Sequence, residues 1–288
     1  MEAVERIART LPESLRNEVA HCANTLLEIR LRAGRPAQLV CAEGQCLCGE
    51  PFSSEQLRGI AGALMEYSIY AWEEELAQGF FTLEGGCRVG VSGRYALRDG
   101  RPAALTQLQS LCVRIAREKP GCMDALVRAV CTEGGLQSLL LVSRPGLGKT
   151  TCLRDLARQL SERGYNVALA DERGELAALC DGIPALDVGV RTDVMDFCPK
   201  HIAIAHMVRA LAPDVIVTDE LGDARDAAAV NDARRSGVAV IASAHAGSIA
   251  EAFARASLRE MAQTFDLAAR LDGAPGQVVE IVRLGQGT

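Results

Sequence analysis

This sequence has few aromatic residues, no long apolar run and no excess of positive charge. Aromatic residues make up 4% of the 288 residues, and the formal net charge is −6. No uninterrupted apolar run reaches the roughly 20 residues that a membrane-spanning helix needs. Nucleic-acid-binding surfaces combine basic residues with aromatic ones. These absences disfavour an integral membrane protein and a general nucleic-acid binder, although a local basic patch is still allowed.

The cysteines lack the regular spacing of a disulfide framework or of a common metal site. There are 11 of them, and an odd number without regular spacing favours a reducing compartment. No second pair of ligands follows the one local cluster, so we expect core or loop residues there rather than a metal site. That cluster is Cys41, Cys46 and Cys48. Residues 1–16 are charged and amphipathic, so we also expect no signal peptide.

Two hydrophobic patterns divide the chain near residue 118. Before it, a helical pattern and short alternating segments predict an antiparallel sheet flanked by helices. The helical pattern covers residues 51–78, and the strands cover 28–32, 80–83, 88–94 and 111–115. After it, apolar strands alternate with helices, which predicts a mainly parallel sheet covered on both faces. These strands cover residues 139–142, 166–170, 215–218, 238–243 and 278–282. We predict a smaller α+β domain over 1–118 and an α/β domain over 119–288.

A glycine-rich segment joins the first apolar strand of the second domain to a helix. It reads Ser143-Arg144-Pro145-Gly146-Leu147-Gly148-Lys149-Thr150, and Thr151 follows. In this context the backbone N–H groups surround a β-phosphate at a helix N-terminus, which disfavours a coincidental glycine-rich turn. Lys149 is expected to bridge the β- and γ-phosphates, and the Thr150 hydroxyl to bind Mg²⁺. Ser143 stands where the motif usually has its first glycine. We predict that residues 143–151 bind ATP.

Acidic residues follow two other apolar strands of this domain. The strand 215–218 leads into Asp219, which is expected to hold Mg²⁺ with Thr150, and Glu220, which is expected to polarise the attacking water. A second acidic group, residues 171–175, follows the strand 166–170 and emerges at the same edge of a parallel sheet. We count Glu172 among the catalytic candidates, with a surface loop as the alternative interpretation.

A histidine follows the next apolar strand. His245 comes just after residues 238–243, so it is placed at the same edge as the phosphate loop. A lone histidine is more often structural, but its position favours contact with the γ-phosphate. We therefore count His245 among the catalytic candidates.

Taken together, these motifs resemble those of the ATPases of type II and type IV secretion systems and pilus motors. That family carries a Walker A loop, an acidic "Asp box", a Walker B strand with a glutamate, and a "His box", in this order. The resemblance implies a RecA-like P-loop core, Mg²⁺-dependent ATP hydrolysis and a hexameric ring. Asp219 departs from the glycine that many members have before the Walker B glutamate.

The N-terminal half narrows this resemblance to a sporulation branch of the family. The segments that carry it are residues 28–36, 86–94 and 113–118. It implies a cytoplasmic ATPase of the mother cell, held at the membrane through integral membrane partners. Such an ATPase would drive or assemble a secretion-like channel complex between mother cell and forespore.

Catalysis of phosphoryl transfer needs cations beyond Lys149, and arginine is the usual supplier. The sequence offers several candidates for an arginine finger and does not choose among them: Arg88, Arg94, Arg98, Arg114 and Arg191. Two other functions stay open at this point. One is a RecA-like ATPase that acts on nucleic acid, and the other is a nucleotide-dependent switch with negligible turnover.

Overall fold

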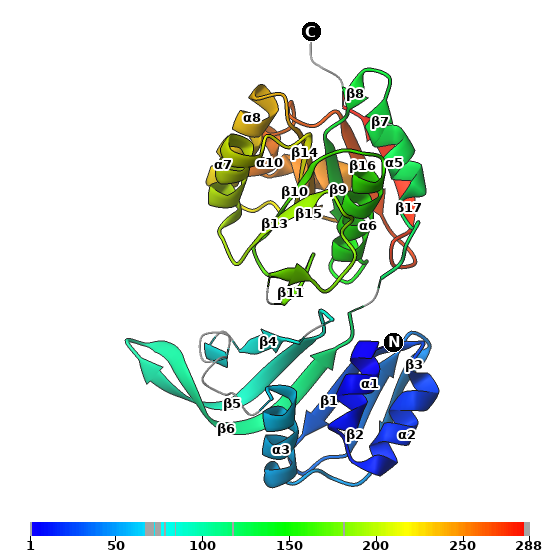
Figure 1. The fold of residues 1–288 in the computed structure, drawn as a ribbon, viewed down its shortest axis with the longest axis vertical. Coiled ribbons are helices and arrows are strands. Elements are labelled where there is room, and N and C mark those ends of the chain that lie inside the picture. The colour runs from blue at the N-terminus through cyan, green and yellow to red at the C-terminus, as the bar shows by residue number, and fades with distance from the viewer. Residues whose placement is uncertain are drawn as a thin grey trace. The chain divides into compact units, whose positions relative to one another are not determined.

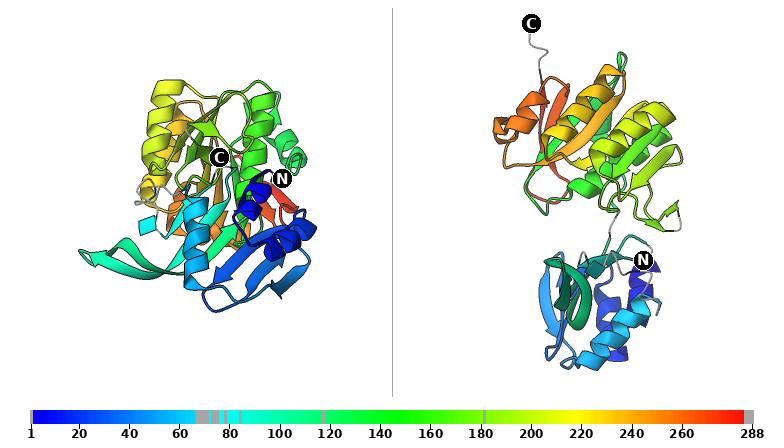
Figure 2. Two further views of the ribbon diagram at one scale, coloured as in Figure 1. Left: turned by 60° about the horizontal axis from the view of Figure 1, so that its bottom comes forward. Right: turned by 90° about the vertical axis from the view of Figure 1, so that its left-hand side faces the viewer.

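The chain forms two compact units, Met1–Ala116 and Arg117–Thr288, which Figures 1 and 2 show as ribbons. The computed structural model describes residues 2–66, 72, 76–77, 79–83, 85–116, 118–180 and 182–284. Among these residues, no helix combines the length and the apolar composition that a membrane crossing requires.

The first unit is a six-stranded antiparallel sheet with helices packed on one face (Figure 2). Its strand order is β3-β2-β1-β6-β5-β4. The strands are β1 Leu26–Arg32, β2 Ala37–Cys41, β3 Gly44–Cys48, β4 Phe80–Thr82, β5 Arg88–Arg98 and β6 Arg101–Arg114. The helices are α1 Glu2–Arg9, α2 Glu13–Cys22 and α3 Ser54–Leu64. The alternation in β1 buries Ile29 and Leu31 against the helices, which confirms the predicted antiparallel sheet.

Within the helix predicted over residues 51–78, α3 covers Ser54–Leu64. A capping box starts α3, because the Ser53 hydroxyl accepts from the Gln56 backbone and the Gln56 side chain accepts from the Ser53 backbone. Residues 65–66 form a turn after Leu64. Most of the remaining prediction, over residues 67–78, lies outside the described residues.

The second unit is built on a seven-stranded, mainly parallel sheet with the strand order β13-β10-β14-β15-β9-β16-β17 (Figure 1). These strands are β9 Leu139–Ser143, β10 Val167–Asp171, β13 Thr192–Asp196, β14 Val215–Glu220, β15 Ala239–His245, β16 Leu267–Leu271 and β17 Val278–Arg283. Two short hairpins add β7 Cys131–Thr132 with β8 Gly135–Leu136, and β11 Leu179–Cys180 with β12 Ile183–Pro184. The helices are α5 Asp124–Val130, α6 Lys149–Glu162, α7 Lys200–Leu211, α8 Ala224–Arg235, α9 Ile249–Ala254 and α10 Ala256–Glu260.

Helices cover both faces of this sheet, as the sequence predicts. Successive residues of a strand face opposite sides. In β9, Leu139 and Leu141 therefore pack with α5 and α6, whereas Leu140 and Val142 pack with the helices of the other face. The parallel strands β9, β10, β14 and β15 consequently end at one edge, where the predicted functional residues follow them.

The prediction is wrong for the orientation of the last strand. Residues 278–282 do form a strand, but β17 runs antiparallel to β16. Only residues 272–277 connect the two strands, which is too short for a parallel crossover. The strands β13 and β16 are not predicted from the sequence pattern. The alanine-rich β16 has a weak strand signal because alanine is depleted in strands.

Candidate functional site

The glycine-rich segment forms a loop between a buried strand and a helix. All five residues of β9 are buried, and α6 begins at Lys149. Gly146 and Gly148 have φ angles of 82° and 80°, a conformation in which a residue with a Cβ is strained. Ser143, at the usual first glycine position, lies in β9 opposite His245. A regular strand residue needs no glycine, so this departure from the motif leaves the loop geometry intact.

The Lys149 ammonium lies over this loop and is largely buried. Its Nζ is 3.2 Å from Ser143 Oγ, 3.3 Å from Ser143 O and 2.7 Å from His245 Nδ1. Burial lowers the pKa of Lys149 to about 8, although the charge of Glu220 opposes this shift. The lysine is therefore a poorly solvated cation that an anion would stabilise.

Three of the four catalytic candidates form one chain of contacts. Lys149 Nζ lies 2.7 Å from His245 Nδ1, and His245 Nε2 lies 3.2 Å from Glu220 Oε2. The strand order explains this arrangement, because β15 with His245 lies between β9 and β14. With the proton on Nε2, the neutral imidazole accepts from Lys149 and donates to the Glu220 carboxylate. This tautomer fixes the direction of Glu220.

The fourth candidate belongs to a neighbouring acidic cluster, which also contains a lysine that the sequence analysis missed. Lys200 Nζ lies 3.0 Å from Glu172 Oε2 and 2.9 Å from Asp219 Oδ1, and it donates to Glu220 O at 2.5 Å. Burial lowers the pKa of Lys200, but the carboxylates of Asp219 and Glu172 outweigh it and keep the pKa above its ordinary value. The signal that could have indicated Lys200 is its place at the start of a helix that closely follows a strand. That strand, β13, was itself not predicted, so the signal was not visible in the sequence.

Asp171, the first residue of the second acidic group, has a structural role. Its side chain is fully buried and accepts from the backbone N–H groups of Glu175, Leu176 and Ala177 at 2.9 Å each. Burial raises its pKa to about 6, against the effect of the Ala177 and Leu176 hydrogen bonds. Arg154 of α6 donates to the carbonyls of Leu176 and Glu175 at 2.6 and 2.8 Å. These two charged side chains shape the loop that carries Glu172.

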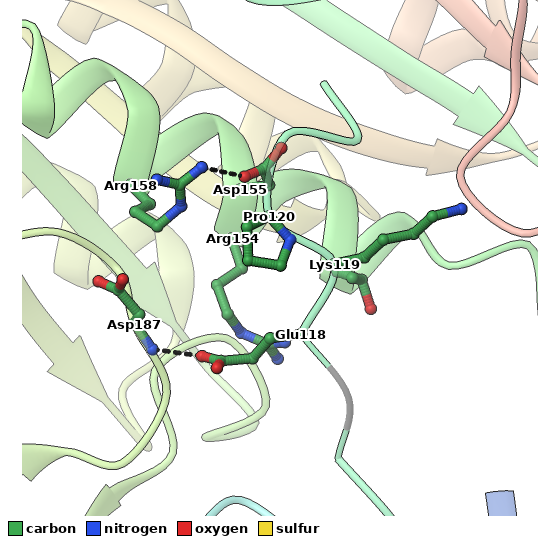
Figure 3. A pocket seen from close by; sticks show the side chains of 8 residues that line it. Glu118, Lys119, Pro120, Arg154, Asp155, Arg158 and Asp187 are labelled. Atoms are coloured by element: carbon green, nitrogen blue, oxygen red, sulfur yellow. Dashed lines mark hydrogen bonds and ion pairs between the residues drawn. The ribbon is translucent and has the colours of Figure 1, made fainter. Parts of the chain in front are cut away.

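Thr151, the last residue of the predicted ATP loop, lines a small cavity beside α6 (Figure 3). Its volume of about 30 Å³ suits a water molecule rather than a nucleoside. Around it, Glu118 accepts from the Asp187 backbone N–H at 2.6 Å, and Arg158 pairs with Asp155 at 2.7 Å (Figure 3). Asp155 also accepts from two backbone N–H groups in residues 121–123. The chain segment before α5 is thus tied to the helix that starts at Lys149.

The candidate finger arginines have diverse surroundings. Arg88 stacks on the Phe80 ring with 3.5 Å to its centroid, and Arg114 lies 3.6 Å from a Glu28 oxygen. The others are exposed: Arg94 and Arg98 on β5, and Arg191 before β13. Their relation to a bound nucleotide stays a prediction.

The side chains present fit Mg²⁺ when it comes with nucleotide. Among the described residues, no group of three or more His, Cys, Asp or Glu side chains is arranged to hold a metal by itself. Mg²⁺ is typically bound by one or two carboxylates together with phosphate oxygens and water. Thr150 in the first turn of α6 and Asp219 at the end of β14 supply the hydroxyl and carboxylate that such a site uses. The Asp219 Oδ1 atom is buried, and Lys200 Nζ is paired with it at 2.9 Å.

Comparison with known proteins agrees with this fold. The chain is 35% identical to stage III sporulation protein AA of Bacillus subtilis (strain 168) over 291 residues, which cover 96% of this chain and 94% of that protein. The fold is similar to that of the ATPase DotB of Yersinia pseudotuberculosis, with a TM-score of 0.63, 15% identity and coverage of 96% and 81% of the two chains. It is also similar to the pilus retraction motor PilT with bound ADP, with a TM-score of 0.61, 16% identity and coverage of 94% and 83%. The fold is therefore that of the RecA-like secretion ATPases.

The family match extends over the same part of the chain. The family described as "Sporulation stage III, protein AA" matches residues 1–284, which includes every predicted site residue. A match of this length, together with the Bacillus subtilis relative, identifies the family. This chain belongs to the stage III sporulation protein AA family.

Proposed function

We propose that this chain is a Mg²⁺-dependent ATPase that drives or assembles a secretion-like channel complex during sporulation. The observation that carries the proposal is the chain of contacts from Lys149, at the start of α6, through His245, at the end of β15, to Glu220, at the end of β14. A phosphate-binding lysine and a carboxylate that can polarise water lie close enough to act on the same terminal phosphate.

The chain's own residues divide the work as follows. The backbone N–H groups of residues 143–151 and the N-terminus of α6 bind the phosphates. Lys149 neutralises charge on the β- and γ-phosphates, and Thr150 with Asp219 would hold the metal, which supplies further charge neutralisation. Glu220 orients and polarises the attacking water, and His245 holds Glu220 in direction. Glu172 assists through the acidic cluster at the same edge.

Partners and location follow from the family rather than from the site. We infer a homo-oligomer, with a hexameric ring as the form that the resemblance to secretion ATPases implies; a neighbouring subunit would then supply the arginine finger. The relatives' sporulation role supports a cytoplasmic protein of the mother cell that reaches the membrane through integral membrane partners. No nucleic acid is expected, in view of the net charge of −6.

Hydrolysis measurements test the proposal. We expect Mg²⁺-dependent ATP turnover by the wild type and a loss of about 10²-fold or more in Glu220→Gln, which keeps the shape but removes the general base. Lys149→Ala should lose nucleotide affinity, whereas Arg209→Gln, an exposed change on α7, should behave as wild type. Equal, near-zero turnover in the wild type and Glu220→Gln would end the motor proposal. Stimulation by single-stranded DNA that is lost at raised salt would point to nucleic acid instead.

A further inference from the structure

The acidic cluster at the end of β14, formed by Glu172 and Asp219, contains the ammonium group of Lys200. The Lys200 ammonium lies close to three oxygens: it pairs with carboxylate oxygens of Glu172 and Asp219 at 3.0 and 2.9 Å, and it donates to the Glu220 carbonyl at 2.5 Å. Two carboxylates and a carbonyl are also the type of oxygen set that binds a hard divalent cation. The ammonium thus stands where the oxygen atoms would otherwise receive such an ion.

The position of Lys200 has no rationale in helix stability. It is the first residue of α7 and follows Pro199, and a cation near a helix N-terminus is unfavourable to the helix dipole. Its side chain is only 7% exposed, and a buried ammonium needs compensating anions. The side chain is therefore placed for the acidic cluster and not for the helix.

Rigid neighbours bring the lysine to that cluster. The Phe197 backbone N–H donates to Asp171 O, and a Cβ at Gly174 would lie 2.9 Å from the Phe197 ring. The loop after β10 and the segment that leads into α7 are thus packed directly on each other. On the other side, β14 has a bulge between Val217 and Glu220, and Lys200 binds the carbonyl at its end.

We propose that the Lys200 ammonium is a built-in cation of the acidic cluster, so that Glu172 and Asp219 receive a divalent ion only together with nucleotide phosphates. The inference rests on the proposed nucleotide site and adds a regulatory property to it. Lys200 is paired with Oδ1 of Asp219, so only the other oxygen of this carboxylate is left for a metal ion or for a water molecule bound to the metal. Binding of Mg²⁺ is thereby made dependent on the phosphates that supply the missing ligands.

Titration of the nucleotide-free full-length chain with Mn²⁺ tests this proposal. The wild type should bind Mn²⁺ more weakly than about 1 mM, the weak end of protein sites with oxygen ligands. Lys200→Gln should bind Mn²⁺ at least about tenfold more tightly, because a cation a few Å away no longer repels it. Arg209→Gln also removes one positive charge from α7 but lies on the exposed surface, so it should bind as the wild type does. The double variant Lys200→Gln/Glu172→Gln should lose most of the gain.

Two results would overturn the proposal. One is a folded Lys200→Gln protein, as judged by circular dichroism and ADP binding, whose Mn²⁺ affinity equals that of the wild type. The other needs no variant: micromolar Mn²⁺ binding by the wild type without nucleotide. Because the titration contains no nucleotide, its outcome is separate from the hydrolysis test with Glu220→Gln, and either proposal can fail alone.

Discussion

The unusual environment of Lys149 makes nucleotide binding sensitive to alkaline pH. A lysine ordinarily has a pKa of 10.5, but burial lowers that of Lys149 to about 8. The ammonium form is the one that neutralises phosphate. Raising the pH from 8 to 9 lowers the protonated fraction of a lysine with a pKa of about 8 from about one half to about one tenth. ADP binding should therefore weaken about fivefold, or by about 1 kcal/mol of binding free energy. The loss should continue until the pH reaches the higher pKa of the complex, where phosphates stabilise the ammonium.

The lowered pKa of Lys149 also affects stability, but in the opposite direction: ADP affinity falls as the pH rises, whereas the free energy of unfolding increases. Between pH 8 and 10.5 the unfolded chain binds more protons at this lysine than the folded one, so the free energy of unfolding should rise with pH. Below pH 8 both states are protonated and the full cost of the buried ammonium is present. From the 2.5-unit difference, Lys149 alone should contribute an increase of about 3 kcal/mol at most. The difference between the wild type and Lys149→Met isolates it from other titrating groups.

Isothermal titration with ADP from pH 7 to 10 measures the affinity, and urea unfolding measures the stability. The ADP phosphates are already ionised above pH 8, so they do not add to the slope. Lys149→Arg provides the control, because its guanidinium stays protonated throughout this range. An ADP affinity that is flat to pH 9.5 in the wild type would refute the reasoning, since it would place the lysine pKa near its ordinary value.

Two further predictions concern the surroundings of the site. Arg154→Met should lower the free energy of unfolding by about 2–4 kcal/mol, because two carbonyls lose a buried charged donor. Urea unfolding measures this change, and Arg209→Met, an exposed substitution, is the control. Equal stability of the two variants would contradict the role of Arg154. Gly148→Ala should strain the loop at φ 80° by about 1–2 kcal/mol and weaken ADP binding, whereas unchanged binding and melting temperature would show that the loop tolerates a Cβ.

Local patterns were sufficient for much of the fold. The alternation in β1, the helical spacing of α3 and the apolar strands of the second unit each depend on neighbours within a few residues, so the sequence alone predicts them. The sheet orientation failed at β17, where the short connection from β16 outweighed the general expectation of parallel strands. The strand β13 escaped prediction because its partly buried residues give little periodic signal.

The sequence by itself determined the glycine-rich loop before Lys149 and the edge of the sheet at which the acidic residues and His245 gather. Parallel strands end on one side, so motif order was enough to place Lys149, Glu220 and His245 there. Only the tertiary structure decided which groups touch. It showed that Asp171 caps a loop, that His245 joins Lys149 to Glu220, and that Lys200 fills the acidic cluster. The contacts of His245 and Lys200 join residues 19 to 96 positions apart, and long-range packing leaves no local pattern in the chain.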